Sequence, residues 1–448
     1  MKTDKYRRLL SCCPSLLDAA DKTANDKNGA LQNNIPAQVT AYVTAPVLFC
    51  YVCYILDSVK KNNINRIFFL SRDGYILKQI ADIIIERKKL KIQTSYLYVS
   101  RYSLRNALYY KCETAEDFEN AGLFTGYTLK SAKNFLKRAG LNDCQRVEVY
   151  KEIGFSDDEN KDLSDSEYSE FCEKIKNDPA LLCKIKNNSE NNYHNIMKYF
   201  ELSGLFEKGK IAVVDSGWMG TVQKTLTALV NGRTDENIIG YYFGLYRRED
   251  DNYKAFLFDV TDAYKYVPTF CNNLFECFCS APHGMTTGYR ECDGKIIPVL
   301  SDANTEMVKM AEIQTKTAVR FTEYACKNEN YIPICKMRDI SARLLKALMY
   351  KPDKQEAEIL GAFPFSDDVT EAKIQRLAGN CKGSISNILL PVRIIRKKKG
   401  KSIYPDKYIY WLYGSIVLTG CKPAWVYRLS VREWERLRLL RERRKLCR

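Results

Sequence analysis

Three sequence strings with the same order of elements constrain the fold most strongly. In each, a short apolar run leads into a polar turn and then a helical stretch. The strings are Arg66–Gly74, Ser95–Arg105 and Ile211–Leu229. Apolar runs rich in β-branched and aromatic residues are typical of buried strands. Together with a further apolar run at Ile238–Tyr246, their alternation with helical stretches predicts an α/β fold with a doubly wound, mostly parallel sheet.

The third string carries the most distinctive turn. Asp215 follows the apolar run Ile211–Val214, and small residues follow the acid. The residues of this turn taken as candidates are Ser216, Gly217, Trp218, Gly220 and Thr221. Glycines let a backbone approach an anion, and a helix start offers unpaired N–H groups with a positive dipole end. The turn is therefore a candidate phosphate and sugar site, although such turns also occur in α/β proteins where they bind nothing.

The first string ends in the turn Ser71-Arg72-Asp73-Gly74. It places a cation, an acid and a glycine at the carboxyl end of a strand, where open α/β sheets build their sites. An alternative interpretation is that Asp73 simply caps the following helix. That alternative explains Asp73 and Gly74, but it gives Arg72 no role.

In the second string, the apolar run leads into Ser100, Arg101 and Arg105. Arginines early in a turn can hold pyrophosphate, because the guanidinium fork matches phosphate oxygens. Arg101 can equally be a solvated surface charge. Further along, Glu276 and a loop with His283, Thr286 and Thr287 are candidates for an acceptor pocket, or for a plain connector.

The sequence predicts four segments. They are a helical lead-in over 1–60, an α/β core over 61–300 with a helical insertion at about 114–208, a helical cap over 301–390, and a basic aromatic tail over 391–448. The tail holds 17 Lys/Arg and 4 Asp/Glu, so it carries +13 of the net charge of +16. A charge confined to one end argues against a nucleic-acid groove and favours contact with an anionic membrane surface. A packed aromatic helix with a solvated basic tail is the alternative.

The 17 cysteines do not indicate a disulfide scaffold, because their number is odd and their spacing irregular. Cys50 and Cys53 lie in an apolar run and are interpreted as core thiols. The opening residues lack the apolar core of a signal peptide, and 41–56 is too short for a membrane span. We therefore expect a reduced, cytoplasmic protein, with contact through the basic tail making it peripheral on the inner face of the cell membrane.

Two of these strings resemble the phosphate-binding loops of type I phosphoribosyltransferases. Arg66–Gly74 is similar to that family's pyrophosphate loop, and Ile211–Thr221 to its loop for ribose and 5-phosphate. The chain has Asp215-Ser216 where the family usually has two adjacent acids, and bulky Trp218 and Met219 where smaller residues are common. The three strings together also resemble a module of bacterial surface-polysaccharide (capsule and O-antigen) proteins. That module often accompanies a haloacid dehalogenase-like phosphatase.

This resemblance implies a transferase that moves phosphoribose from phosphoribosyl pyrophosphate to a glycan or lipid-linked glycan. Arg72 and Arg101 would hold pyrophosphate together with Mg²⁺, Asp215 would bind ribose hydroxyls, and Asp73 would be a base or a metal-linked ligand. The full set of expected site residues is Asp73 and Asp215 as catalytic groups, with Ser71, Arg72, Gly74, Ser100, Arg101, Ser216, Gly217, Trp218, Gly220, Thr221 and Glu276 binding substrate.

Two other function classes stay open. One is a phosphohydrolase that uses Asp73 or Asp215 as its nucleophile. A phosphatase of the haloacid dehalogenase type needs an apolar strand ending in D-x-D, with its two acids two positions apart, whereas Asp259 and Asp262 are three positions apart. The other class is a non-catalytic scaffold of a polysaccharide-assembly complex.

Overall fold

The protein is built around a five-stranded, all-parallel sheet. A computed structural model describes residues 3–26, 34–125, 130–154, 160–234, 237–327, 332–366, 374–405, 407 and 409–446. The strand order is β2-β1-β3-β4-β5. The strands are β1 (Arg66–Leu70), β2 (Gln93–Leu97), β3 (Ile211–Asp215), β4 (Ile239–Gly244) and β5 (Tyr253–Phe258). The predicted α/β fold and parallel sheet are confirmed.

Helices cover both faces of this sheet, because residues on its strands alternate between two cores. Ile67 and Phe69 of β1 face a cluster that includes α4 (Ala45–Lys61) and α5 (Gly74–Lys88). Phe68 and Leu70 face the opposite cluster. The helices on that side are α6 (Arg101–Leu108), α11 (Pro179–Leu202) and α12 (Thr221–Val230). This two-sided burial explains why the central strands β1 and β3 are continuous apolar runs rather than alternating ones.

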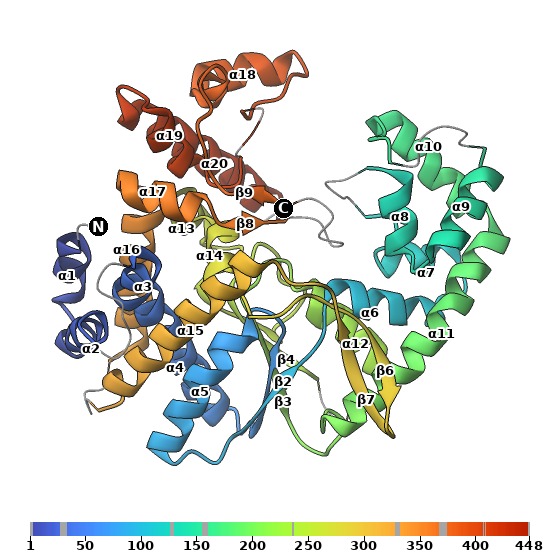
Figure 1. The fold of residues 1–448 in the computed structure, drawn as a ribbon, viewed down its shortest axis with the longest axis horizontal. Helices are drawn as coiled ribbons and strands as arrows, with labels where there is room; N and C mark the ends of the chain where they lie inside the picture. Colours follow the sequence, from blue (N-terminus) through green and yellow to red (C-terminus); the bar gives the residue numbers. More distant parts are fainter. Residues whose placement is uncertain are drawn as a thin grey trace.

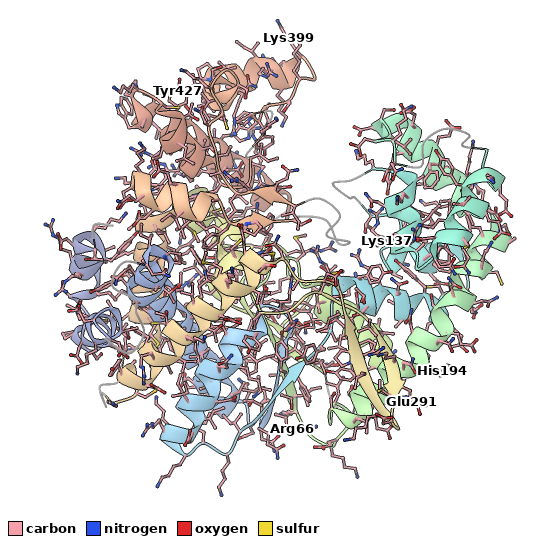
Figure 2. The ribbon with its side chains drawn as sticks, in the orientation of Figure 1. Arg66, Lys137, His194, Glu291, Lys399 and Tyr427 are labelled. Carbon is pink, nitrogen blue, oxygen red and sulfur yellow. The ribbon has the colours of Figure 1, made fainter. Side chains whose placement is uncertain are left out.

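The strand order creates a crevice at one place. From β1 the chain passes through α5 to β2 on one side, whereas from β3 it passes through α12 to β4 on the other. The carboxyl ends of β1 and β3 therefore lie where the winding reverses, which is where open α/β sheets bind ligands. Arg66, which starts β1, lies at the bottom of Figure 2, so this strand runs upward into the body of the molecule.

The lead-in helices pack against the sheet as part of the core. They are α1 (Asp4–Leu10), α2 (Pro14–Ala24), α3 (Ile35–Val39), the π-helical turn η2 (Thr40–Thr44) and α4. Among the described residues, one helical stretch, 35–61, is long and apolar enough to cross a membrane, and 89% of its most apolar window is buried within the protein. In this structure the stretch is therefore a core element of the helical lead-in.

The predicted insertion forms a helical lobe with its own apolar cluster. After the short turn η3 (Tyr109–Lys111) it comprises α7 (Ala115–Asn120), α8 (Ala132–Arg138), α9 (Asp143–Glu152), α10 (Asp165–Lys176) and the first half of α11. Phe118, Phe135 and Phe171 lie at the centre of its cluster. Figure 1 shows these helices to one side of the sheet, joined to the core through α6 and α11.

The residues after the sheet wrap over its carboxyl edge. They include α13 (Ala263–Tyr266), the 3₁₀ turn η4 (Val267–Thr269), α14 (Asn272–Phe278) and a hairpin of β6 (Thr286–Cys292) and β7 (Lys295–Leu300). The stretch predicted as a helical cap contains α15 (Thr305–Ala325), α16 (Ile334–Met349) and α17 (Lys354–Gly361). The hairpin was not predicted, because its strands lie in a stretch interpreted as a connector.

The C-terminal segment is folded onto the cap. It contains the short pair β8 (Pro364–Phe365) and β9 (Gln375–Arg376), the 3₁₀ turn η5 (Ile385–Ile388), α18 (Leu390–Lys398), α19 (Leu412–Thr419) and α20 (Ala424–Leu446). Trp411 is fully buried, and its Nε1 donates to the Met349 carbonyl at 2.8 Å. In Figure 1, α18, α19 and α20 extend beyond the rest of the cap. Trp411 is therefore packed inside the protein, as expected from the alternative of a packed aromatic helix.

Candidate functional site

The three predicted turns meet around one cavity of about 370 Å³ at the carboxyl ends of β1 and β3. This volume lies within the usual range for small-molecule sites, roughly 300–1,000 Å³. Of the residues singled out from the sequence, those that line it are Ser71, Arg72, Asp73, Ser100, Arg101, Asp215, Ser216, Gly217, Trp218, Thr221 and Glu276. Gly74 and Gly220 belong to the same turns but do not line the cavity. Residues more than 140 positions apart in the sequence are thus brought together.

The turn after β1 is tied to the end of β2 through Ser71. Its Oγ donates to the Val99 carbonyl at 2.7 Å and accepts from the Val99 N–H at 3.0 Å. Gly74, which starts α5, is a packing glycine, because a Cβ there would lie 2.7 Å from the Phe69 backbone carbonyl carbon. These contacts fix the position of Arg72 and Asp73 between them.

Asp73 is not a helix cap, although it directly precedes α5. Within the described residues, its side chain makes no capping hydrogen bond to that helix. Its Oδ2 instead accepts a hydrogen bond from Ser216 Oγ in the turn after β3. The capping interpretation is therefore wrong, and the two candidate turns are directly connected.

The turn after β3 needs glycine at two positions. At Gly217, with φ of +151°, a Cβ would lie 2.5 Å from the Gly244 carbonyl oxygen. At Gly220, with φ of +66°, a Cβ would lie 2.4 Å from the Tyr253 ring. Peptide bonds 71–72 and 217–218 are both cis. Because Gly220 precedes α12 and has no side chain to cap it, the first N–H groups of this helix are open to an anion near Thr221.

Asp215 and Asp73 form a coupled pair of carboxyl groups. Burial raises the pKa of both, and repulsion from Asp73 raises the pKa of Asp215 further. The hydrogen bond from Ser216 and the charges of Arg72 and Arg101 act against burial to lower the pKa of Asp73. The pair therefore holds protons more tightly than isolated aspartates, as is common at sites of acid–base chemistry.

Trp218 closes its turn against the core. It is only 9% exposed, and its ring stacks on Phe258 with centroids 6.1 Å apart and an interplanar angle of 6°. Its Nε1 donates to Glu276 Oε1 at 2.6 Å. The indole therefore positions Glu276 at the cavity and is itself too enclosed to serve as a stacking platform for a sugar.

Several lining residues were not singled out for this cavity. They are Val99, Met219, Val222, Tyr246, Asn272, Met285, Thr286 and Ser366. Thr286 had been considered only for an acceptor pocket, and in the structure its carbonyl accepts from Ser100 Oγ at 2.6 Å. Asn272 starts the short helix α14, and Met285 and Ser366 come from connecting segments, where no periodicity or motif marks a residue.

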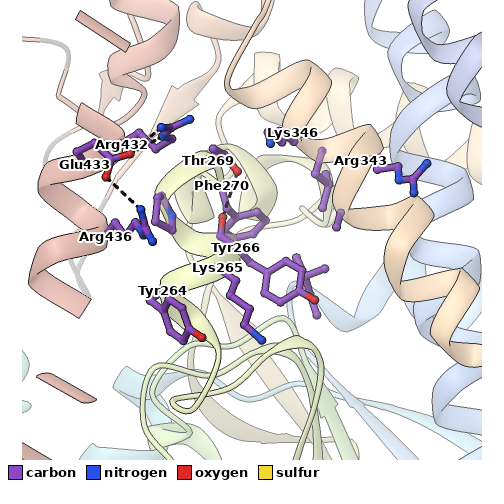
Figure 3. Close-up of a pocket in the computed structure, with 14 residues that line it drawn as sticks. Tyr264, Lys265, Tyr266, Thr269, Phe270, Arg343, Lys346, Arg432, Glu433 and Arg436 are labelled. Atoms are coloured by element: carbon purple, nitrogen blue, oxygen red, sulfur yellow. Dashed lines mark hydrogen bonds and ion pairs between the residues drawn. The ribbon is translucent and has the colours of Figure 1, made fainter. Parts of the chain in front are cut away.

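A larger cavity of about 510 Å³ lies elsewhere, between α13, η4, α16 and α20 (Figure 3). Its rim holds Lys265 and Lys346, while Arg432 and Arg436 pair with Glu433. The candidate turns are all at the smaller cavity, whose carboxylates are coupled, so we assign the candidate site there.

The site offers few groups to a metal ion. No group of three or more His, Cys, Asp or Glu suited to a metal occurs in the described part of the chain. Asp73 and Asp215 line the cavity, and their charges interact with each other. Mg²⁺ is commonly bound by one or two carboxylates together with substrate phosphates, and these residues fit that mode. No family model matches the sequence, and no curated protein is significantly similar to it.

Proposed function

We propose that the protein is a transferase that moves a phosphoribosyl group from phosphoribosyl pyrophosphate to a glycan hydroxyl in cell-surface polysaccharide synthesis. The observation that carries the proposal is the convergence of three separate turns on one cavity. That cavity contains two arginines, two coupled aspartates and the open start of α12. The core would then be of the type I phosphoribosyltransferase kind.

The two ends of the donor match two parts of the cavity. Arg72 and Arg101 would hold the pyrophosphate, with Ser71 and Ser100 fixing the turns that carry them. At the other end, the 5-phosphate would lie against the N–H groups of residues 217–221 and the hydroxyl of Thr221. Asp215, between these parts, would accept hydrogen bonds from the ribose hydroxyls.

The charge of the cavity is consistent with a bound cation. Among the described residues, Asp73, Asp215 and Glu276 line it together with two arginines. The charged side chains of the cavity therefore do not neutralise the negative charge of a pyrophosphate. Bound Mg²⁺ would neutralise the pyrophosphate charge, with Asp73 or Asp215 as its protein contact. The chain's residues then orient the sugar and exclude water, which is how such reactions gain most of their rate.

In the transfer step, Asp73 takes the proton of the acceptor hydroxyl. The hydroxyl oxygen forms a bond to the anomeric carbon, and the bond from that carbon to pyrophosphate breaks. Its electron pair leaves on the pyrophosphate oxygen. A general base contributes about 10²–10⁴-fold to such a step.

A haloacid dehalogenase-like phosphohydrolase fits less well. Its two acids are two positions apart, whereas the residues two positions after Asp73 and Asp215 are Tyr75 and Gly217. The test compares two reactions of the full chain with Mg²⁺. Pyrophosphate release from phosphoribosyl pyrophosphate supports the transferase, and phosphate release from p-nitrophenyl phosphate supports the hydrolase. If neither reaction occurs, and an Arg72→Ala/Asp215→Ala variant keeps full biological activity, the protein is a scaffold.

We further propose that the C-terminal helices contact an anionic membrane on its cytoplasmic side, where lipid-linked acceptors reside. On α18, Ile394 and Ile395 are 45% and 54% exposed, beside Arg396, Lys397 and Lys398. Exposed apolar groups beside cations are typical of interfacial helices, and each basic residue contributes about 1 kcal/mol near anionic lipid.

Point variants test the membrane proposal better than a deletion of 391–448, which would also remove the buried Trp411. An Ile394→Glu/Ile395→Glu variant should lose sedimentation with phosphatidylglycerol vesicles. A matched control is Leu202→Glu, at an exposed apolar residue of α11. Equal sedimentation of both variants and the wild type would contradict membrane contact through α18.

A further inference from the structure

A second cavity of about 310 Å³ adjoins the candidate donor cavity. Arg72, Asp73 and Glu276 line both of them. Asp215, in contrast, lines the donor cavity and is not among the residues of the second one. Asp73 therefore lies where the contents of the two cavities would meet.

The walls of the second cavity suit a neutral, hydroxylated ligand. Several of its polar side chains come from the connector after α14 and from the segment that leads into α15: Ser280, Ser301, Asp302 and Asn304. Its apolar side chains include Ala281, Met307, Val308 and Phe365. A sugar presents both hydroxyl groups and apolar C–H faces, and such mixed walls provide for each.

The charges of the second cavity disfavour an anion. Of the described residues that line it, Asp73, Glu276 and Asp302 are acidic, and Arg72 is the one guanidinium or ammonium group. A phosphate there would meet an excess of negative charge, whereas a neutral sugar would not. The donor cavity differs, because Arg101 and the start of α12 also face it.

His283 forms a fixed wall of this cavity. Its Nδ1 lies 2.8 Å from the Gly284 carbonyl and must donate to it, so in the neutral ring Nε2 accepts from Tyr96 OH at 2.8 Å. Burial lowers the pKa of His283, and the charge of Arg72 lowers it further. Both ring nitrogens are thus engaged in holding the side chain in place, and Asp73 is the better placed base.

We propose that the second cavity binds a neutral sugar residue of the acceptor and presents one of its hydroxyls to Asp73. The transfer step rests on the proposed function, but the binding of a sugar does not. Of the two roles left open for Asp73, general base and metal ligand, this proposal requires the role of base.

The direct test is saturation-transfer NMR on the full chain with methyl β-D-galactopyranoside, methyl α-D-mannopyranoside and methyl N-acetyl-β-D-glucosaminide. At least one glycoside should receive saturation from the wild type. Val308→Trp, which fills the cavity, should abolish the signal, and Met307→Trp serves if the first variant does not fold. Lys309→Trp, on the exposed side of the same helix, should keep it. Absence of transfer to all three glycosides, or an unchanged signal in the cavity variants, overturns the proposal.

A second titration separates this proposal from the proposed function. Val308→Trp should bind phosphoribosyl pyrophosphate with Mg²⁺ as the wild type does, whereas Thr221→Trp should lose that binding and keep the glycoside signal. If phosphoribosyl pyrophosphate does not bind but a glycoside binds in a Val308-dependent way, the donor assignment fails and the sugar site stands.

Discussion

Two pairs of aspartates follow strands of the same sheet, and their surroundings differ. Asp73 follows β1, Asp215 is the last residue of β3, and both line one cavity, where burial raises the pKa of both. Asp259 and Asp262 follow β5, and both side chains accept hydrogen bonds from backbone N–H groups of their own turn. Asp259 Oδ1 accepts from the Thr261 N–H at 2.8 Å, and Asp262 Oδ1 accepts from the Asp259 N–H at 3.0 Å.

The ion pairs repeat this contrast. Asp262 also pairs with Arg338, which donates to the Leu257 carbonyl as well, so that this arginine fastens α16 to the end of β5. Arg72 and Arg101 both face the cavity. An acid at the end of a strand thus has a structural role when groups of its own turn supply its hydrogen bonds. It is a candidate for chemistry when it is buried beside a second acid.

The largest expected difference between the pairs is in catalysis. Asp73→Asn should lower the rate of pyrophosphate release about 10²–10⁴-fold, because it removes the proposed base. Asp215→Asn should chiefly weaken donor binding, since it removes the acceptor of the ribose hydroxyls. Asp259→Asn should change the rate of pyrophosphate release and the donor affinity by no more than about twofold, since conservative substitutions away from the site usually have small effects. Steady-state kinetics measure this, and equal losses in all three variants would contradict the contrast.

Removal of the arginines should separate donor affinity from stability. Arg72→Ala and Arg101→Ala should each weaken binding of phosphoribosyl pyrophosphate about 10–100-fold, as expected for a charge-assisted contact of ~1.5–3 kcal/mol. Arg338→Ala should instead lower the melting temperature and leave affinity unchanged. Calorimetric titration and thermal unfolding of the same samples check both. A loss of donor affinity in Arg338→Ala alone would reverse the assignment.

A smaller effect is expected in the pH dependence of the rate. The hydrogen bond from Ser216 lowers the pKa of Asp73, so Ser216→Ala should raise it. A base must be deprotonated, and the acidic limb of the pH–rate profile should therefore move to higher pH. Thr261→Ala, which removes a hydroxyl beside Asp259, should leave the profile in place. An acidic limb that stays unmoved in Ser216→Ala would exclude Asp73 as the titrating base.

The smallest effect is on stability. Asp215 has a higher pKa in the folded than in the unfolded protein, so the wild type loses stability as the pH rises from about 4 through the folded pKa. Asp215→Asn removes this loss and keeps the acceptor for the Ser216 N–H, which the wild-type Oδ1 binds at 2.8 Å. Its melting temperature at pH 7 should therefore rise by about 2 °C or more. Asp262→Asn should lower the melting temperature, and a fall in both variants would contradict the difference in burial.

The sequence was sufficient for the parallel sheet and for the main turns of the site. Both depend on local patterns, namely apolar runs such as Ile211–Val214 and small or charged residues directly after them. Because carboxyl ends of parallel strands share one edge, Arg72, Asp73 and Asp215 could be expected near one another.

Contacts between residues far apart in the sequence could not be predicted from such local patterns. The hydrogen bond between Ser216 and Asp73 joins residues 143 positions apart, and no local pattern encodes it. The role of Trp218 depends on Phe258 and Glu276, which come from later segments. The β6–β7 hairpin also escaped prediction, because Thr286–Cys292 is polar at its exposed end and carries a weak strand pattern.

The measurement that tests the central claim most directly is a calorimetric titration of the full chain with phosphoribosyl pyrophosphate and Mg²⁺, with UDP-glucose as the comparison ligand. We expect saturable binding of phosphoribosyl pyrophosphate, a dependence on Mg²⁺, and loss of the heat signal in Arg101→Ala but not in Arg338→Ala. Binding of UDP-glucose in preference to phosphoribosyl pyrophosphate, or binding of neither, would contradict the assignment of the Asp73 and Asp215 cavity as a phosphoribosyl donor site.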